Sequence, residues 1–247
     1  MNSGVPKDYP FLSVRSLSCA YTTRPWGMFG KKEIKPVLDK VSLEIKRGEI
    51  FGLVGESGCG KTTLGKCILG LVDYEGEISV NGRMRKKKPS CRERKERALE
   101  VQAVFQDPGA SLNPVKSIGW ILEEPLRASG LLSAAERRMA VDRMLDIIGL
   151  DPGYKKRRPG ELSSGQKQRV SIGAALIVNP GLIVADEPVS SLDVSVGAQI
   201  LNLFNDINKK LGLTLLFISH NLDIVHYLCD TIAVLQNGHI DKIAHNG

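Results

Sequence analysis

The stretch IFGLVGESGCGKT, residues 50–62, decides the fold of this chain. Residues 50–54 form a nearly continuous apolar run, which is typical of a strand buried on both faces. Residues 55–62 fit the pattern G-x-x-x-x-G-K-[ST], and a segment with helical periodicity follows over residues 62–71. Glycines let backbone N–H groups converge on phosphate oxygens, and the N-terminus of a helix adds positive potential. A strand, a glycine-rich loop and a helix in this order predict a phosphate-binding loop.

A second acidic motif lies at the end of another apolar run, LIVADEP, residues 182–188. A phosphate-binding loop needs a carboxylate there to hold Mg²⁺, largely through its water shell, and Asp186 is the candidate. Glu187 is placed to act as a base on the attacking water. Lys61 would reach the β- and γ-phosphates, and Thr62 would offer its hydroxyl to Mg²⁺. Taken alone, Asp-Glu-Pro also fits a turn at the end of a strand; the phosphate-binding loop upstream favours hydrolysis of a nucleotide.

The rest of the chain alternates short apolar runs with helical segments, which predicts an α/β fold. A capping box at residues 133–136 predicts the start of a helix that stops at Gly149. Asn81-Gly82 and Asn237-Gly238 indicate hairpin turns. Strands are expected at residues 11–17, 41–45, 49–54, 77–80, 101–105, 182–185, 213–218, 231–235 and 239–243. Residues 107–178 are expected to be mainly helical, with another helix over 194–211.

Composition excludes several classes of protein. The chain has 247 residues, 42% apolar and 25% charged, which is ordinary for a soluble globular protein and excludes collagen-like and disordered chains. Its five cysteines are scattered, with no C-x-x-C pair, so we expect a reduced chain without a metal–thiolate site. The first ten residues have no apolar core, and the longest apolar stretch is broken at residues 179–181. We therefore expect neither a secretory signal nor a transmembrane segment.

Further motifs carry a family resemblance. LSSGQKQR, residues 162–169, resembles the LSGGQ signature of ATP-binding cassette (ABC) ATPases. Gln106 resembles the glutamine of the Q-loop, residues 190–193 resemble the D-loop, and His220 resembles the switch histidine. Tyr21 resembles the aromatic residue that stacks on adenine. These motifs occur in the order of the family and cover nearly the whole chain.

The resemblance implies a P-loop NTPase core of the ABC ATPase type, with an antiparallel β subdomain and a helical subdomain insertion. It implies a single domain over residues 1–247. Residues 1–106 and 171–247 would form the core and the β subdomain, and residues 107–170 the helical subdomain.

The resemblance also implies roles for individual residues, with ATP and Mg²⁺ as cofactors. Glu187, His220 and Gln106 would be catalytic, and Mg²⁺ would be held by Thr62, Gln106 and Asp186. Trp26 and Phe29 are alternatives to Tyr21 for stacking on adenine. Nucleotide contacts would come from Tyr21, Gly55, Glu56, Ser57, Gly58, Cys59, Gly60, Lys61, Thr62, Thr63, Ser163, Gly165, Gln166 and Asp193.

Three segments, residues 104–114, 192–203 and 215–225, are similar to the ATPases of oligopeptide, dipeptide and nickel importers. Such ATPases work in pairs beneath two membrane permeases that an external binding protein supplies. The resemblance therefore implies a second ATPase subunit, identical or not, and a peripheral place on the cytoplasmic face of the membrane. Ser163, Gly165 and Gln166 would serve the γ-phosphate of the ATP bound to the partner subunit. A soluble ABC ATPase that remodels nucleic acid and a regulatory ATPase of a cytosolic complex remain alternatives.

The chain departs from the family pattern at two positions and carries one strongly basic segment. Ser164 replaces the first glycine of LSGGQ, and Asn221 stands where this subfamily usually has Asp. The formal net charge of +7 is concentrated in residues 83–97, which hold nine basic and two acidic residues. We interpret this segment as a solvated surface arm. Contact with anionic lipid headgroups or a permease loop is the alternative, and without interleaved aromatic residues no nucleic acid is expected to bind.

Overall fold

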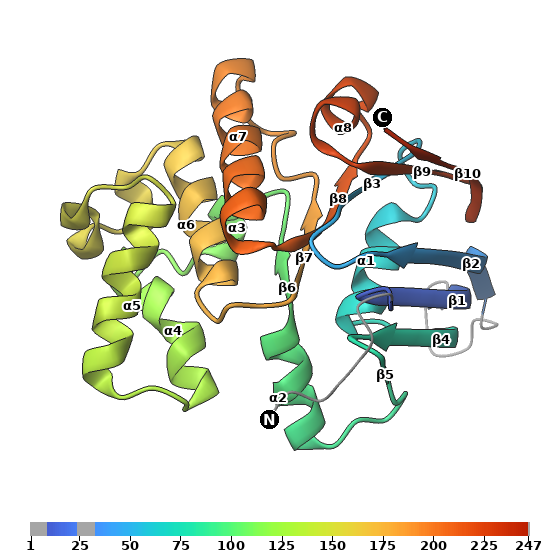
Figure 1. The fold of residues 1–247 in the computed structure, drawn as a ribbon, viewed down its shortest axis with the longest axis horizontal. Helices are drawn as coiled ribbons and strands as arrows, with labels where there is room; N and C mark the ends of the chain where they lie inside the picture. The colour runs from blue at the N-terminus through green and yellow to red at the C-terminus, as the bar shows by residue number, and fades with distance from the viewer. Residues whose placement is uncertain (1–8, 24–32, 247) are drawn as a thin grey trace. The chain divides into compact units, whose positions relative to one another are not determined.

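The computed structural model describes residues 9–23 and 33–246, so Trp26 and Phe29 lie outside the described residues. The chain forms two compact units, which Figure 1 colours by position in the sequence. The first unit comprises residues 1–89 and 216–247, and the second comprises residues 90–215.

An antiparallel sheet in the first unit has the strand order β2-β1-β4-β5 (Figure 1). Apolar side chains of β1, β2 and β4, among them Leu12, Leu43 and Ile78, are buried in its core. The turn between β4 and β5 is Asn81-Gly82, with φ angles of 52° and 73° that suit a type I′ turn. The strands are β1 (Leu12–Thr23), β2 (Glu33–Ile45), β4 (Glu75–Val80) and β5 (Arg83–Met84).

Strands β1 and β2 extend well beyond the expected ranges of 11–17 and 41–45. Their outer halves pair with each other, for example Tyr21 with Lys35. Most side chains there are exposed and show no apolar alternation, so only the pairing defines these segments as strands.

The first unit also contains the strand that precedes the phosphate-binding loop. This strand, β3 (Ile50–Val54), is buried throughout and runs parallel to β9 (Thr231–Gln236). Strand β9 pairs antiparallel with β10 (His239–His245) across the expected Asn-Gly turn. Helices α1 (Lys61–Leu69) and α8 (Leu222–Leu228) belong to this unit.

The second unit begins with helix α2 (Cys91–Glu100), where the sequence analysis assigned no element. A capping box stabilises the start of this helix: the Ser90 hydroxyl accepts from the N–H of Glu93, and the Glu93 carboxylate accepts from the N–H of Ser90. No residue of α2 is buried, which agrees with a solvated surface for this part of the basic segment. Strand β6 (Val101–Val104) follows, parallel to β7 (Leu182–Asp186).

The remaining helices lie in the second unit, and Figure 1 shows α4, α5 and α6 side by side. The capping box at Ser133 and the stop at Gly149 are confirmed. The helix that begins at the signature ends at Leu176, two residues before the end of the region, residues 107–178, that was expected to be mainly helical. The elements are α3 (Pro108–Ser111), α4 (Ile118–Ser129), α5 (Ala134–Ile147), η1 (Pro152–Lys156), η2 (Pro159–Glu161), α6 (Ser164–Leu176) and α7 (Val194–Leu211).

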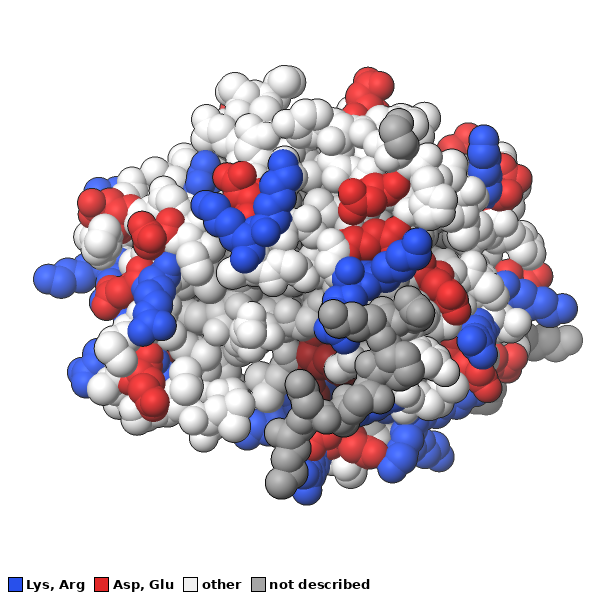
Figure 2. Space-filling model, in the orientation of Figure 1, with Lys and Arg blue, Asp and Glu red and all other residues white. Residues whose placement is uncertain are grey.

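Strand β8 (Thr214–Ser219) follows α7 and leads back into the first unit. Parallel strands, an antiparallel sheet and helices confirm the predicted α/β class. On the face drawn in Figure 2, basic and acidic side chains are interspersed. Among residues 9–23 and 33–246, no helix is both long and apolar enough to cross a bilayer.

Candidate nucleotide site

The loop after β3 is held open by glycines at positions where no other residue fits. A Cβ on Gly55 would collide with the carbonyl oxygen of Leu235. Gly58 and Gly60 have φ angles of 83° and 112°, which side-chain-bearing residues rarely adopt. At Gly60 a Cβ would also lie 2.7 Å from Leu38 Cδ2.

Lys61 closes this loop from inside. Its Nζ donates to the carbonyl oxygens of Gly55, at 2.7 Å, and Glu56, at 2.9 Å. The side chain is buried, and its charge therefore lies within the loop. Helix α1 begins at Lys61 behind the N-cap Gly60, which offers no side chain to the first-turn N–H groups. These donors, the charge and the helix N-terminus together make a cradle for an anion such as phosphate.

Two more candidate residues belong to the first unit. The hydroxyl of Tyr21 lies 3.4 Å from Thr63 Oγ1 on α1, which brings this aromatic residue next to the helix that carries the cradle. His220 is exposed directly after β8. Asn221 caps α8 by accepting from the N–H groups of Asp223 and Ile224, so asparagine replaces aspartate here without loss of the cap.

The second unit carries the acidic part of the predicted site. Strands β6 and β7 are parallel, with Val104 opposite Ala185. Asp186, the last residue of β7, and Gln106, two residues after β6, therefore lie at the carboxyl ends of neighbouring strands, the edge where ligands bind in such sheets. Asp186 is only 8% exposed, so its side chain is largely shielded from bulk solvent at the end of β7.

Glu187 has an unusual backbone conformation, with φ at 52°. Non-glycine residues held in this region cluster at functional sites. The turn is fixed by Ser190, whose N–H and hydroxyl both donate to the Glu187 carbonyl, at 3.3 and 3.0 Å. The next residue, Ser191, donates its hydroxyl to the carbonyl of Gln106 at 3.3 Å, which joins the expected D-loop to the Q-loop.

The signature segment forms the N-terminus of α6. Ser163 is the N-cap: its hydroxyl accepts from the N–H of Gln166, and Gln166 Oε1 accepts from the N–H of Ser163 at 3.0 Å. Ser164 is exposed, so the residue that replaces the family glycine points to solvent. A Cβ on Gly165 would collide with Val196 Cγ1, which shows how tightly α6 packs on the start of α7. Asp193, the last D-loop residue, is the N-cap of α7.

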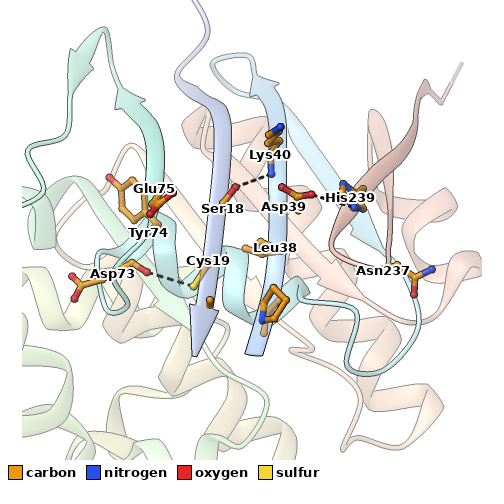
Figure 3. A pocket seen from close by; sticks show the side chains of 13 residues that line it. Ser18, Cys19, Leu38, Asp39, Lys40, Asp73, Tyr74, Glu75, Asn237 and His239 are labelled. Atoms are coloured by element: carbon orange, nitrogen blue, oxygen red, sulfur yellow. Dashed lines mark hydrogen bonds and ion pairs between the residues drawn. The ribbon is translucent and has the colours of Figure 1, made fainter. Parts of the chain in front are cut away.

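Figure 3 shows a separate cavity of about 710 Å³ in the first unit. It is lined by parts of β1 and β2, by residues 73–75 and by the β9–β10 turn, and no residue of the 55–63 loop lines it. Cys19, labelled there, donates to the carbonyl of Asp73 at 3.4 Å. Burial raises the pKa of Cys19 and of its neighbour Cys67 on α1, so both remain thiols. This cavity is not the phosphate cradle.

Comparison with known proteins identifies the family. The sequence profile of ABC transporters matches residues 38–190. The chain is 45% identical over 238 residues to a Brucella ovis protein named as a peptide import ATP-binding protein, covering 96% of this chain and 73% of that protein. The chain belongs to the ABC transporter family.

Two further matches concern sequence and structure. An oligopeptide transport ATP-binding protein of Bacillus subtilis is 43% identical over 224 residues, covering 88% of this chain and 67% of that protein. The ATP-binding cassette MJ0796, solved as a dimer with ADP and phosphate, matches with a TM-score of 0.82 and 28% identity, over 96% of this chain and 99% of that chain. The chain is therefore an ABC-type ATPase, as the motifs predict.

The donor atoms of this ABC ATPase suit Mg²⁺. The residues that the resemblance assigns to Mg²⁺ carry oxygen atoms: within the second unit Asp186 has a carboxylate and Gln106 an amide oxygen, and within the first unit Thr62 on α1 has a hydroxyl. Oxygen donors of these kinds, completed by water and phosphate oxygens, are what Mg²⁺ prefers. Within the described residues, no group of three or more His, Cys, Asp or Glu is placed to hold a metal ion.

Sequence reasoning missed the contacts that support the signature. Tyr154 and Val196 touch the signature although neither belongs to a family motif, and Ser191 belongs to the expected D-loop, but its bond to Gln106 was not predicted. The S-x-x-Q spacing of Ser163 and Gln166 is a sequence signal for a capping box. No comparable signal exists for Tyr154, because its contact joins separate elements.

Proposed function

We propose that this chain is the ATP-hydrolysing subunit of an ABC importer for a peptide, nickel or a similar small solute. The observation that carries the proposal is identity above 40% to two proteins named for peptide import or transport, and the order of the family motifs in the sequence supports it. The chain would act with a second ATPase subunit and two permeases at the cytoplasmic face of the membrane, and an external binding protein would deliver the solute.

The cradle of the first unit would bind the triphosphate. Lys61, which in the structure bonds carbonyl oxygens of its own loop, would turn to the β- and γ-phosphate oxygens. Tyr21 would stack on adenine, since its hydroxyl already lies near Thr63. Thr62, Gln106 and Asp186 would hold Mg²⁺, which supplies neutralisation of phosphate charge.

Hydrolysis would use groups of both units. Glu187 would take the proton from the attacking water, and the turn fixed by Ser190 would hold its carboxylate in place. His220 would position the same water, and Gln106 would sense water and Mg²⁺.

The N-terminus of α6 would serve the ATP of the second subunit. Ser163 would present its hydroxyl and Gly165 its N–H, while the positive end of the helix attracts the γ-phosphate. Gln166 would keep this turn in shape through the capping box. Asp193, at the start of α7, would contact the nucleotide across the same interface.

Co-purification tests the proposal directly. The tagged chain, expressed in its own host and purified from detergent-solubilised membranes, is expected to bring down two permeases and an ATPase partner. Solute uptake in that host should stop when Glu187 is changed to Gln. Recovery with a soluble enzyme complex or with nucleic acid, and no permease, would contradict the importer and support the alternatives.

A further inference from the structure

The side-chain amide of Gln166 is held at both ends. Its Oε1 accepts from the backbone N–H of Ser163 at 3.0 Å, which closes the capping box. Its Nε2 donates to the hydroxyl of Tyr154 at 2.9 Å. The second bond comes from η1, a short helix outside every nucleotide motif.

Helix η1 is itself anchored to two other helices of the second unit. The Arg157 carbonyl, just after η1, accepts from the N–H of Ile118, the first residue of α4, at 2.8 Å. Lys155 Nζ lies 2.6 Å from the Asp142 carboxylate on α5. Gly119 of α4 lies against η1, because an added Cβ would be 3.2 Å from the Lys155 carbonyl oxygen. These contacts to α4 and α5 therefore hold the backbone of η1, which carries Tyr154, in place.

The Tyr154 ring is fixed as well. The Arg157 guanidinium lies 4.1 Å from the ring centroid, a cation–π contact, and the Arg157 N–H donates to the Tyr154 carbonyl at 3.0 Å. The side chain is half-buried, which limits the other rotamers that it could adopt. Its hydroxyl is thus held where the Gln166 amide needs a partner.

We infer that Tyr154 is a positioning residue for the signature: its hydroxyl orients Gln166, and Gln166 orients the anion-binding turn at Ser163. The inference rests on the proposed function, because it assigns that turn to the γ-phosphate of the partner's ATP. The Ser163 hydroxyl accepts from the Gln166 N–H, so the serine and the glutamine fix each other. Without the tyrosine hydroxyl, one end of the amide is released and the turn is less preorganised for phosphate.

The test is Tyr154→Phe, which removes only the hydroxyl, measured in the assembled transporter purified through this chain. Loss of one neutral hydrogen bond predicts a fall in kcat of about three- to tenfold. The KM for ATP should stay within about twofold, because the cradle of the first unit is unchanged. The melting temperature should also stay near that of the unaltered protein.

A double-mutant cycle separates positioning from a merely structural role. In a Gln166→Met background the tyrosine hydroxyl has no amide to orient, so adding Tyr154→Phe should not lower kcat further. Tyr9→Phe is the matched control, since it removes the hydroxyl of an exposed tyrosine in the first unit and should leave kcat unchanged.

Two results would overturn the inference. One is a Tyr154→Phe protein with unaltered kcat. The other is an equal effect of Tyr154→Phe in both backgrounds, which would mean that the hydroxyl acts independently of Gln166. Failure of the proposed function looks different: the chain would then purify without permeases, and if only the assignment of the α6 turn to phosphate fails, Ser163→Ala would also leave turnover unaltered.

Discussion

Helices α1 and α6 both begin where the chain is expected to meet phosphate, yet their N-termini are built in opposite ways. Helix α1 starts behind Gly60, with φ at 112° and no side-chain cap, so its first donors stay open. Helix α6 starts behind Ser163 and closes its first turn with a capping box. The first site is shaped by backbone conformations that only glycine readily allows. The second is shaped by side-chain hydrogen bonds, one of them from Tyr154.

The difference suits the two tasks. A loop that wraps a triphosphate needs many open N–H groups and a mobile lysine, which meanwhile rests on carbonyls of its own loop. A helix end that, as proposed, would meet the nucleotide of another subunit must keep its shape alone, and side-chain hydrogen bonds at its first turn provide that rigidity.

The largest expected effect tests whether the chemistry belongs to a side chain outside both helix N-termini, namely Glu187 directly after β7. Glu187→Gln should leave ATP binding intact and lower turnover at least about a hundredfold, because the amide cannot take a proton from water. Steady-state ATPase rates and equilibrium titration with a labelled nucleotide measure the two quantities. If ATP turnover persists in the variant, another group must take the proton from the attacking water.

The open terminus is tested by Lys61→Ala. Removing the charge from the cradle should weaken ATP binding about tenfold or more, since hydrogen bonds to charged groups contribute about 1.5–3 kcal/mol. Titration with a labelled nucleotide measures the loss. Lys66→Ala, in the last turn of the same helix, is the matched control and should bind normally. Equal weakening in both variants would mean that only general charge matters.

The tight packing of the closed terminus is tested by Gly165→Ala. The new methyl group collides with Val196, so unfolding should become easier by about 1–3 kcal/mol in urea denaturation. Adding Val196→Ala should relieve the collision and recover part of the loss. Gly160→Ala is the control, because a Cβ there meets nothing within 4 Å. If Gly165→Ala is as stable as the unaltered protein, the packing of α6 on α7 accommodates the added methyl group without cost.

The smallest effect concerns the helices that support the closed terminus. Hydrogen bonds from Arg127 and Arg137 lower the pKa of Glu123 from 4.5 to about 2. A lowered pKa in the folded state contributes stability above pH 4.5, and that contribution is lost as the pH falls from 4.5 to about 2. In Glu123→Gln the free energy of unfolding should depend less on pH over that range than in the unaltered protein. Replacing the exposed Glu124 with Gln should leave the pH dependence unchanged. If Glu123→Gln and Glu124→Gln lose stability equally as the pH falls, the Glu123 carboxylate does not contribute to acid stability.

The phosphate-binding loop illustrates how much could be predicted from sequence. Its glycines, lysine and threonine are local in the chain, so a pattern of residues implies a geometry directly, and β3 and α1 were expected on either side. Helix α2 was not predicted, although Ser90 and Glu93 have the S-x-x-E spacing of a capping box. The outer halves of β1 and β2 were missed for a different reason, since only the partner strand makes Tyr21 part of a strand.

By itself, the sequence determined the α/β class, the anion-binding loop, the order of the ABC motifs and the candidate residues, because each depends on near neighbours in the chain. Only the tertiary structure decided that Gln106 and Asp186 lie at the carboxyl ends of neighbouring strands, that Gly165 leaves no space before Val196, and that Tyr154 holds Gln166. The physical reason is that these contacts join residues from separate elements, so packing and strand pairing, which no local pattern encodes, bring them together.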